Sequence, residues 1–316
     1  MNSDPDSQDS LQPLIQQLKL PSPITQVHSP LIEQQQVELF IKRDELIHPD
    51  IQGNKWRKLK YNLIQAIEEK HHTILSFGGA YSNHLHALAA AGSLCNLKTI
   101  GIIRGEAPSP LNPCLQDMQN SGMQLDFITR RQYREKTGAD FLTSLRQQFG
   151  NFYLIPEGGN NAAGKQGCAE ILDELNAPYD VICCEIGSGT MFSALIENNP
   201  FPNTEFIGFS VMKNPQLQAD ITAQLGEKIF DNTQWHINHD YHFGGFAKSS
   251  PELFQFIKQF KAQHHIQLEP VYSGKMLYGI MQMIAQGNFV KGSRICAIHG
   301  GGLQGIRGFP ELLSAD

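Results

Sequence analysis

The sequence has no long apolar run and no excess of basic residues. No stretch of its 316 residues approaches the ~18 to 20 continuous apolar residues that a membrane span needs. The first ten residues, MNSDPDSQDS, are acidic and polar where a secretory signal has basic residues followed by an apolar core. We therefore expect a soluble protein of the cytoplasm.

The six cysteines and the net charge exclude further classes of protein. The cysteines are scattered and form no C-x-x-C pair, which predicts reduced, mostly buried thiols in place of a disulfide framework. The formal net charge of -6 disfavours attraction to nucleic acid or to an anionic membrane. The expected ligand is therefore a small molecule.

Apolar strand patterns alternate with helical patterns along most of the chain, and its length predicts two domains or one large α/β unit with an insertion. The first examples are VELFIKR, KWRKLKYNLIQAIEEK, TILSF and NHLHALAAAGSL. This alternation predicts an α/β fold with open parallel sheets. Because such sheets bind ligands outside the carboxyl ends of their strands, the candidate binding loops are FGGAYSN, PEGGNN, EIGSGT and IHGGG.

The turn after the strand VICCEI has the composition of an anion site. Gly187, Ser188, Gly189 and Thr190 precede a predicted helix, so unpaired N-H groups, two hydroxyls and the helix dipole favour a phosphate there. A tight strand-to-helix turn that binds nothing explains the local pattern equally well.

Lys55 follows Gly53 and Asn54 at a predicted helix start. The helix dipole disfavours an ammonium there, and Arg57 and Lys58 add positive charge, so we predict a lowered pKa for Lys55. A neutral lysine amine is the nucleophile of Schiff-base chemistry. From spacing alone, a solvated lysine on a basic helix face is the simpler interpretation.

Ser82 and Asn83 stand where a helix is predicted to follow the strand TILSF. Helix capping explains both residues, and hydrogen bonds to a ligand are the alternative. His84 and His86 point apart on a helix and lack a third ligand at a suitable spacing, so we predict no metal site.

Gly159 to Lys165 follow the pattern G-x-x-x-x-G-K of a nucleotide-triphosphate loop. The next residue is Gln166, where that motif needs a serine or threonine hydroxyl for magnesium, and Glu185 is the only candidate acid downstream. A nucleotide hydrolase is therefore kept only as a rival hypothesis.

Six segments in this order resemble the D-cysteine desulfhydrase and 1-aminocyclopropane-1-carboxylate deaminase family of pyridoxal-5'-phosphate (PLP) enzymes. They are QGNKWRKLKYN, SFGGAYSNHLHALAAAG, IPEGGNNAAGKQGCAEI, EIGSGTM, EPVYSGKMLYGIMQMI and AIHGGGLQG. The resemblance implies a tryptophan-synthase-β-like fold, fold type II of the PLP enzymes, with the cofactor in the cleft between two domains. The larger domain would comprise residues 1–50 and 165–316 and the smaller one residues 51–164, in a homodimer.

The resemblance also implies roles for single residues. Lys55 matches the lysine that carries the cofactor, Ser82 a serine near the substrate, and Asn83 the asparagine that binds the phenolic oxygen of PLP. The turn of Gly187, Ser188, Gly189 and Thr190 matches the phosphate cup. Tyr272 matches an active-site tyrosine, for which a buried tyrosine bonded to backbone is the structural alternative.

The implied reaction uses the cofactor as an electron sink for charge at Cα of a small amino acid. Lys55, released by the substrate amine, would move the proton. The product would hydrolyse to a 2-oxo acid and ammonia, and with D-cysteine the leaving group would be sulfide.

Three positions depart from the family pattern. Phe246 stands where the family has a second tyrosine, and loss of a general acid-base group typically costs ~10²-fold or more. Ser273 and Gly300 stand where family members place a carboxylate or threonine beside the pyridine nitrogen, and Ser273 is the expected partner here. Ser273 would donate to an unprotonated nitrogen, which suits β-elimination better than chemistry that needs a full carbanion. We therefore predict D-cysteine over the cyclopropane substrate, with a cyclopropane-carboxylate deaminase or a PLP-binding protein with little turnover as alternatives.

Overall fold

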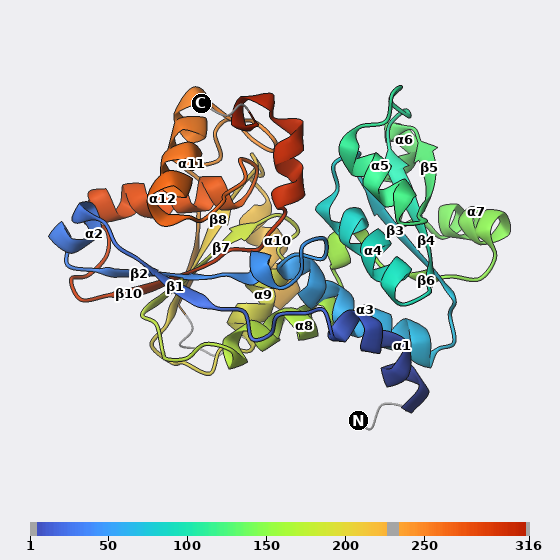
Figure 1. Cartoon of the computed structure of the whole chain (residues 1–316), viewed down its shortest axis with the longest axis horizontal. Helices are drawn as coiled ribbons and strands as arrows, with labels where there is room; N and C mark the ends of the chain where they lie inside the picture. Colours follow the sequence, from blue (N-terminus) through green and yellow to red (C-terminus); the bar gives the residue numbers. More distant parts are fainter. Residues whose placement is uncertain (1–4, 226–233, 314–316) are drawn as a thin grey trace. The chain divides into compact units, whose positions relative to one another are not determined.

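The computed structural model describes residues 5–225 and 234–313, and the chain divides into two compact units (Figure 1). The smaller unit comprises Met1–Leu18 and Lys55–Gly164, and the larger unit comprises Lys19–Asn54 and Lys165–Asp316. The boundaries expected from the sequence, 1–50 with 165–316 and 51–164, place residues 1–18 and 51–54 differently. Of that expected larger domain, residues 1–4, 226–233 and 314–316 lie outside the described residues.

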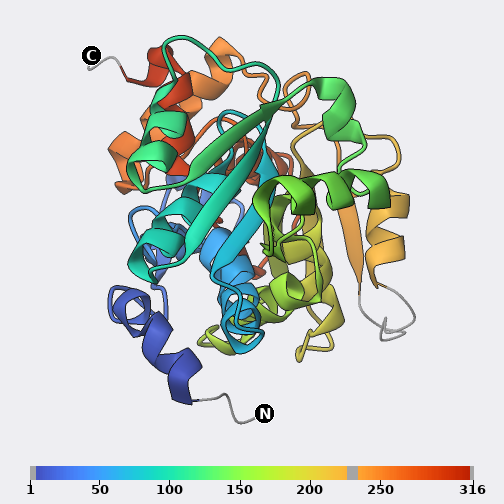
Figure 2. The same ribbon diagram turned by 90° about the vertical axis from the view of Figure 1, so that its right-hand side faces the viewer.

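The smaller unit is built on a parallel four-stranded sheet with the order β5-β4-β3-β6 (Figure 2). Its strands are β3 (Thr73–Gly78), β4 (Lys98–Arg104), β5 (Gln124–Ile128) and β6 (Tyr153–Leu154). Its helical segments are α1 (Pro5–Ile15), α3 (Asn54–Glu68), α4 (Asn83–Leu94), α5 (Pro113–Asn120), α6 (Arg130–Arg134), α7 (Ala139–Phe149) and η2 (Glu157–Gly159). The predicted alternation of strand and helix is confirmed.

The larger unit is built on a six-stranded sheet with the order β1-β2-β10-β7-β8-β9. Its strands are β1 (Ile24–Val27), β2 (Glu38–Lys42), β7 (Val181–Ile186), β8 (Glu205–Ser210), β9 (Trp235–Asn238) and β10 (Arg294–Ile298). Its helical segments are α2 (Pro30–Gln34), η1 (Asp44–Leu46), α8 (Ala162–Asp173, begun in the smaller unit), α9 (Thr190–Glu197), α10 (Leu217–Leu225), α11 (Pro251–His264), α12 (Ser273–Ala285), η3 (Leu303–Gly308) and η4 (Pro310–Leu312). Across the described ranges, no helix combines the length and apolar character that crossing a membrane requires.

Both faces of the six-stranded sheet are covered, as the side chains of β7 show. Val181 and Cys183 pack in one core with α11 and α12, whereas Ile182, Cys184 and Ile186 pack in another with α8, α9 and α10. Figure 1 shows the same two layers of helices on either side of this sheet. Burial on both faces explains why β7 is a continuous apolar run interrupted only by a glutamate.

The two edge strands of this sheet were missed by the sequence analysis. β1 pairs antiparallel with β2, so the sheet is not wholly parallel, and β9 lies at the opposite edge beside β8. Each has only four residues, and most of their side chains are partly exposed. A strand of four residues is too short for an apolar run or an alternation to be distinguished from the surrounding loops.

All six cysteine side chains are buried. Burial raises the pKa of Cys95 to about 11 and that of Cys296 to about 12. Because the thiolate is the reactive form, these thiols are structural core residues.

Leu277 on α12 is fully buried in the core beneath α11. Leu277→Ala should lower the free energy of unfolding of the larger unit by about 2–5 kcal/mol, because it deletes buried methyl groups and leaves a cavity. Gln282→Ala, on a partly exposed position of the same helix, should change it by less than about 0.5 kcal/mol. Urea unfolding followed by Trp235 fluorescence in a Trp56→Phe background measures both, and equal effects would contradict the position of Leu277.

Candidate functional site

The turn between β7 and α9 presents a set of anion donors. Gly189 is the N-cap residue of the eight-residue helix α9 and has a φ of +83°. Having no side chain, it cannot cap the first N-H groups of the helix. The Ser188 Oγ and Thr190 Oγ1 atoms lie 2.9 Å apart, so the two hydroxyls stand together at this turn. Backbone N-H groups, two hydroxyls and the positive end of a helix dipole form the donor set that suits a dianionic phosphate.

Helix α10 packs against this turn through Ile221 and Gln224. The positive φ of Gly189 favours glycine, and a Cβ atom there would lie 2.4 Å from Ile221 Cδ1 and would have to push that side chain aside. Gln224 donates through Nε2 to Ser188 O at 3.1 Å, and its Oε1 accepts from Ser193 Oγ at 3.2 Å. Gln224 could not be predicted from the sequence, because no local pattern connects it with a turn so far away in the chain.

The residues before Lys55 are held by the loop that follows β10. Gly53 has a φ of +54°, and a Cβ atom there would lie 2.2 Å from Gly300 O. The Asn54 N-H donates to the same carbonyl oxygen at 3.2 Å. Lys55 itself is half-buried at the second residue of α3, as the sequence predicted for a helix start.

In the smaller unit, Lys55 and Lys58 lie in the electrostatic environment of His84. Burial, together with the positive charges of Lys58 and Lys55, lowers the pKa of His84 to about 3. The imidazole Nε2 lies 3.0 Å from Ser76 Oγ. His84 is therefore neutral at physiological pH, and a lowered pKa for Lys55 stays a prediction.

Ser82 is the N-cap residue of α4. Its Oγ accepts a hydrogen bond from the Leu85 N-H at 3.2 Å, and Asn83 is the first residue of the helix. Both side chains are half-buried. The capping interpretation of Ser82 therefore holds in this structure, and the roles of Ser82 and Asn83 toward a ligand stay predictions.

Tyr272 and Phe246 lie beside each other near the turn after β7. A Cβ atom on Gly187 would lie 3.2 Å from Tyr272 Cε1, so glycine leaves room for this ring. The rings of Phe246 and Tyr272 meet edge to face, with centroids 6.0 Å apart and an interplanar angle of 73°. The structure therefore brings Tyr272 together with the candidate anion turn.

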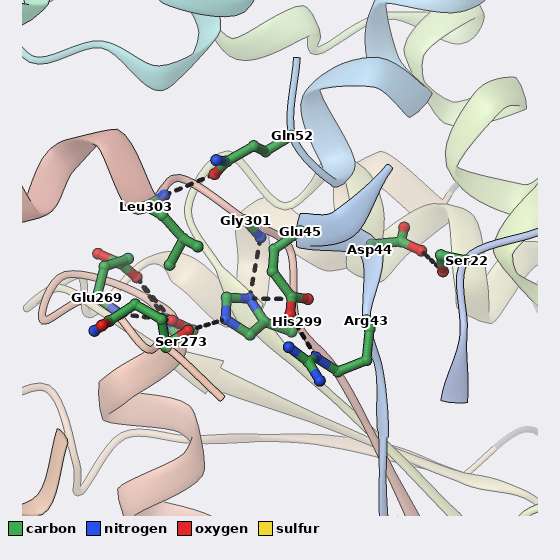
Figure 3. A network of polar contacts seen from close by, with 11 residues as sticks. Ser22, Arg43, Asp44, Glu45, Gln52, Glu269, Ser273, His299, Gly301 and Leu303 are labelled. Atoms are coloured by element: carbon green, nitrogen blue, oxygen red, sulfur yellow. Dashed lines mark hydrogen bonds and ion pairs between the residues drawn. The ribbon is translucent and has the colours of Figure 1, made fainter. Parts of the chain in front are cut away.

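Glu269 organises the start of α12 (Figure 3). Its carboxylate accepts hydrogen bonds from the backbone N-H groups of Val271, Tyr272 and Ser273 at 2.7, 2.7 and 2.6 Å. Burial raises the pKa of Glu269, and these three hydrogen bonds oppose that rise. The carboxylate thereby sets the backbone position of Tyr272. An acidic residue just before a helix start is a signal that the sequence analysis could have used.

A buried ammonium fastens the loop that carries Phe246. Lys275 Nζ donates to Val211 O, His242 O and Gly245 O at 3.2, 2.9 and 2.8 Å. Burial lowers the pKa of Lys275 to about 8. Three carbonyl acceptors satisfy all three donors of the ammonium, so Lys275 positions this loop against α12.

The G-x-x-x-x-G-K segment is held by structural contacts. A Cβ atom on Gly164 would lie 2.0 Å from Gly159 O, so the loop is closed on itself. Lys165 Nζ forms an ion pair with Glu197 at 2.7 Å and also donates to Gln224 O. Neither feature provides the open cradle and available lysine that a nucleotide triphosphate needs.

The chain is similar in sequence and fold to known proteins. Residues 15–301 match a family model described as "Pyridoxal-phosphate dependent enzyme". A bifunctional D-cysteine desulfhydrase/1-aminocyclopropane-1-carboxylate deaminase of Arabidopsis thaliana is 28% identical, over 91% of this chain and 77% of its own. A D-cysteine desulfhydrase of Salmonella paratyphi A is 26% identical, over 84% and 87%. The crystal structure of an ACC deaminase homologue superposes with a TM-score of 0.78 at 23% identity, over 98% and 99%, and the fold expected from the sequence is confirmed.

The low pKa of His84 makes the stability of the smaller unit sensitive to acid. The unfolded chain binds a proton at this residue below its ordinary pKa of 6.5, and the folded chain only near 3, so stability is lost as the pH falls through that window. His84 should contribute a loss of about 2 kcal/mol between pH 7 and pH 5. His84→Gln should remove this contribution in urea titrations of the cofactor-free protein, and parallel pH curves for the two proteins would contradict it.

Proposed function

Because the chain belongs to the family of pyridoxal-phosphate dependent enzymes, we propose that it is a lyase that releases ammonia and a 2-oxo acid from a small amino acid. The preferred substrate in this proposal is D-cysteine. One D-cysteine and one water then give one pyruvate, one ammonia and one hydrogen sulfide. Two relatives named for D-cysteine desulfhydrase activity, from Arabidopsis thaliana and Salmonella paratyphi A, support the choice.

The phosphate of PLP is assigned to the turn of Gly187, Ser188, Gly189 and Thr190. The chemistry of the donors supports this assignment, because the N-H groups at the start of α9 and two hydroxyls 2.9 Å apart suit a dianion. The absence of side chains at both glycines also lets a phosphate approach the backbone closely. The turn therefore fits the cofactor.

Lys55 is assigned as the lysine that binds the aldehyde carbon of PLP. Its place at the second residue of α3, where the helix dipole opposes an ammonium, supports a nucleophilic neutral amine. Asn83 is assigned to the phenolic oxygen of the cofactor and Ser82 to the substrate. These assignments follow the family resemblance, and the position of both residues at the start of α4 supports them.

Bound PLP supplies an electron sink for negative charge at Cα of the substrate. The protein must then orient the substrate and move protons. Lys55, once its amine is released, is assigned to take the proton from Cα. The Tyr272 hydroxyl is assigned to the substrate, in keeping with its ring lying against Gly187 in the phosphate turn.

The Phe246–Tyr272 pair is the observation that carries the preference for D-cysteine. Phe246 is 48% exposed beside Tyr272, so this pair offers one hydroxyl where the resemblance leads us to expect two. Elimination from D-cysteine expels hydrosulfide, a stable anion that leaves without an acid. Ring opening of the cyclopropane substrate must instead put a proton on carbon, which makes a missing phenol more costly.

Two alternatives remain from the sequence. 1-Aminocyclopropane-1-carboxylate is the second candidate substrate, supported by the bifunctional relative of Arabidopsis thaliana. A protein that binds PLP with little turnover is the third candidate, because Phe246 removes a hydroxyl that acid-base catalysis would use.

A cytoplasmic homodimer completes the proposal. The homodimer follows the family resemblance, and sedimentation velocity of the PLP-loaded protein tests it against the 35.3 kDa mass of one chain. The six cysteines are free thiols buried in the structure, which suits a reducing compartment. Fractionation of the native host cells tests the compartment.

Lys55→Ala should abolish both the borohydride-reducible imine and pyruvate release from D-cysteine, because it removes the amine that binds the cofactor. Lys60→Ala, on the same helix, is the matched control and should keep both. Mass spectrometry of the reduced, digested protein locates the cofactor. An imine that persists in Lys55→Ala would overturn the lysine assignment, whereas an intact wild-type imine without pyruvate would favour the binding protein.

Phe246→Tyr should shift the balance of substrates by restoring the missing phenol. We expect the ratio of kcat/KM for 1-aminocyclopropane-1-carboxylate to that for D-cysteine to rise, by up to about 10²-fold. Phe243→Tyr adds a hydroxyl in the same loop against Tyr278 and serves as the control. Assays of 2-oxobutanoate and pyruvate measure both rates. A wild type that already turns over the cyclopropane substrate faster would refute the preference for D-cysteine.

A further inference from the structure

Glu185 is a buried carboxylate at the carboxyl end of β7. It is the next-to-last residue of the strand, 5% exposed, and comes just before the phosphate turn that begins at Gly187. The neighbouring strand residues Cys184 and Ile186 belong to an apolar core. Burying a carboxylate costs several kcal/mol unless polar or cationic groups compensate its charge. Glu185 is therefore a candidate to face a cationic or hydrogen-bond-donating group of a ligand.

Glu185 occupies the space that a side chain at position 300 would fill. A Cβ atom on Gly300 would lie 2.1 Å from Glu185 Oε1 and 2.6 Å from Asn54 Nδ2. Gly301 and Gly302 have φ values of +80° and +85°, but the φ of Gly300 lies outside the left-handed region. Space, and not backbone conformation, therefore accounts for glycine at 300.

The carboxylate stands at the edge of the sheet where a ligand is expected. Cys184 on β7 pairs with Ile298 on β10, so Glu185 and Gly300 both follow this pair at the carboxyl ends of the two strands, where the Glu185 side chain reaches the space beside Gly300. Parallel sheets bind ligands at this edge, and the phosphate turn lies there too. A cofactor whose phosphate is bound by that turn would therefore lie at the same edge as Glu185.

Two other polar side chains near this edge, His299 and Ser273, form hydrogen bonds within the chain (Figure 3). His299 Nε2 lies 2.8 Å from Gln267 O, and its Nδ1 accepts from the Gly301 N-H at 3.2 Å, which places the proton on Nε2. Ser273 is fully buried, and its Oγ lies 3.1 Å from Glu269 N and 3.3 Å from Glu269 Oε1. The Ser273 hydroxyl is thus part of the start of α12.

We propose that the Glu185 carboxylate binds the ring nitrogen of PLP and holds it in the protonated, pyridinium form. This inference rests on the proposed function, because it requires the phosphate in the turn after β7. A carboxylate beside a nitrogen favours its charged form, and a pyridinium ring is a stronger electron sink than a neutral pyridine. Glu185 thereby takes the role that the sequence analysis gave to Ser273, and the preference for D-cysteine depends on Phe246 alone.

The test uses PLP labelled with ¹⁵N in the ring, bound to the wild type and to three variants without substrate. The ¹⁵N NMR spectrum should show a pyridinium nitrogen in the wild type and in Ser273→Ala. Glu185→Gln should show a neutral nitrogen, because it keeps the shape of the side chain and removes its charge. Gly300→Ala should do the same by an independent route, since its Cβ displaces the carboxylate. The visible absorption of the Lys55 imine shows that each protein is loaded.

Each outcome bears on one hypothesis. A pyridinium that persists in both Glu185→Gln and Gly300→Ala, or a neutral nitrogen in a loaded wild type, overturns the role of Glu185 and leaves the proposed function intact. Loss of the pyridinium in Ser273→Ala with its retention in Glu185→Gln assigns the nitrogen to Ser273 and also overturns it. A wild type that forms no imine with PLP overturns the proposed function itself.

Discussion

The close approach of two backbone segments, at Gly53 and at Gly300, is the constraint on which the candidate site depends. A single Cβ atom on Gly53 would lie 2.2 Å from the carbonyl oxygen of Gly300, and one on Gly300 would meet the Glu185 carboxylate at 2.1 Å. Glycine at both positions lets the chain before α3 lie against the loop after β10, where the Asn54 N-H bonds that carbonyl. The residue that follows Asn54 is Lys55, so this contact fixes where the helix carrying the candidate cofactor lysine begins.

Two buried charges position candidate site residues of the larger unit. The Glu269 carboxylate binds the backbone that leads into α12 and so sets the position of Tyr272. Lys275 lies on the same helix, two residues after Ser273. Its ammonium donates to three backbone carbonyl groups and so holds the loop that carries Phe246. Backbone groups form hydrogen bonds with each charge, which offsets the cost of burying it. The same hydrogen bonds hold the connected backbone segments in place. The edge-to-face contact of Phe246 with Tyr272 follows from these hydrogen bonds.

The proposed cofactor site has groups that favour negative charge and groups that favour positive charge at the same edge of the sheet. The uncapped start of α9, with the hydroxyls of Ser188 and Thr190, suits a phosphate dianion, while Glu185 suits a cationic nitrogen. A heterocycle with a phosphate on one side and a basic nitrogen on the other is complementary to both. With Phe246 in place of a phenol, the same site is poorer in proton donors, which favours a substrate whose leaving group needs none.

Local sequence pattern by itself determined the α/β class, the positions of the long helices and central strands, and the glycine-rich turns that hold the candidate residues. Apolar periodicity and helix-start residues depend on near neighbours, so a continuous run such as β7 or the GNK before α3 is visible without a structure. Only the tertiary structure decided the edge strands β1 and β9, the engagement of Ser273 with Glu269, and the place of Glu185 beside Gly300. These depend on which distant segments pack together, and a glycine in the sequence does not reveal whose side chain fills the space that it leaves.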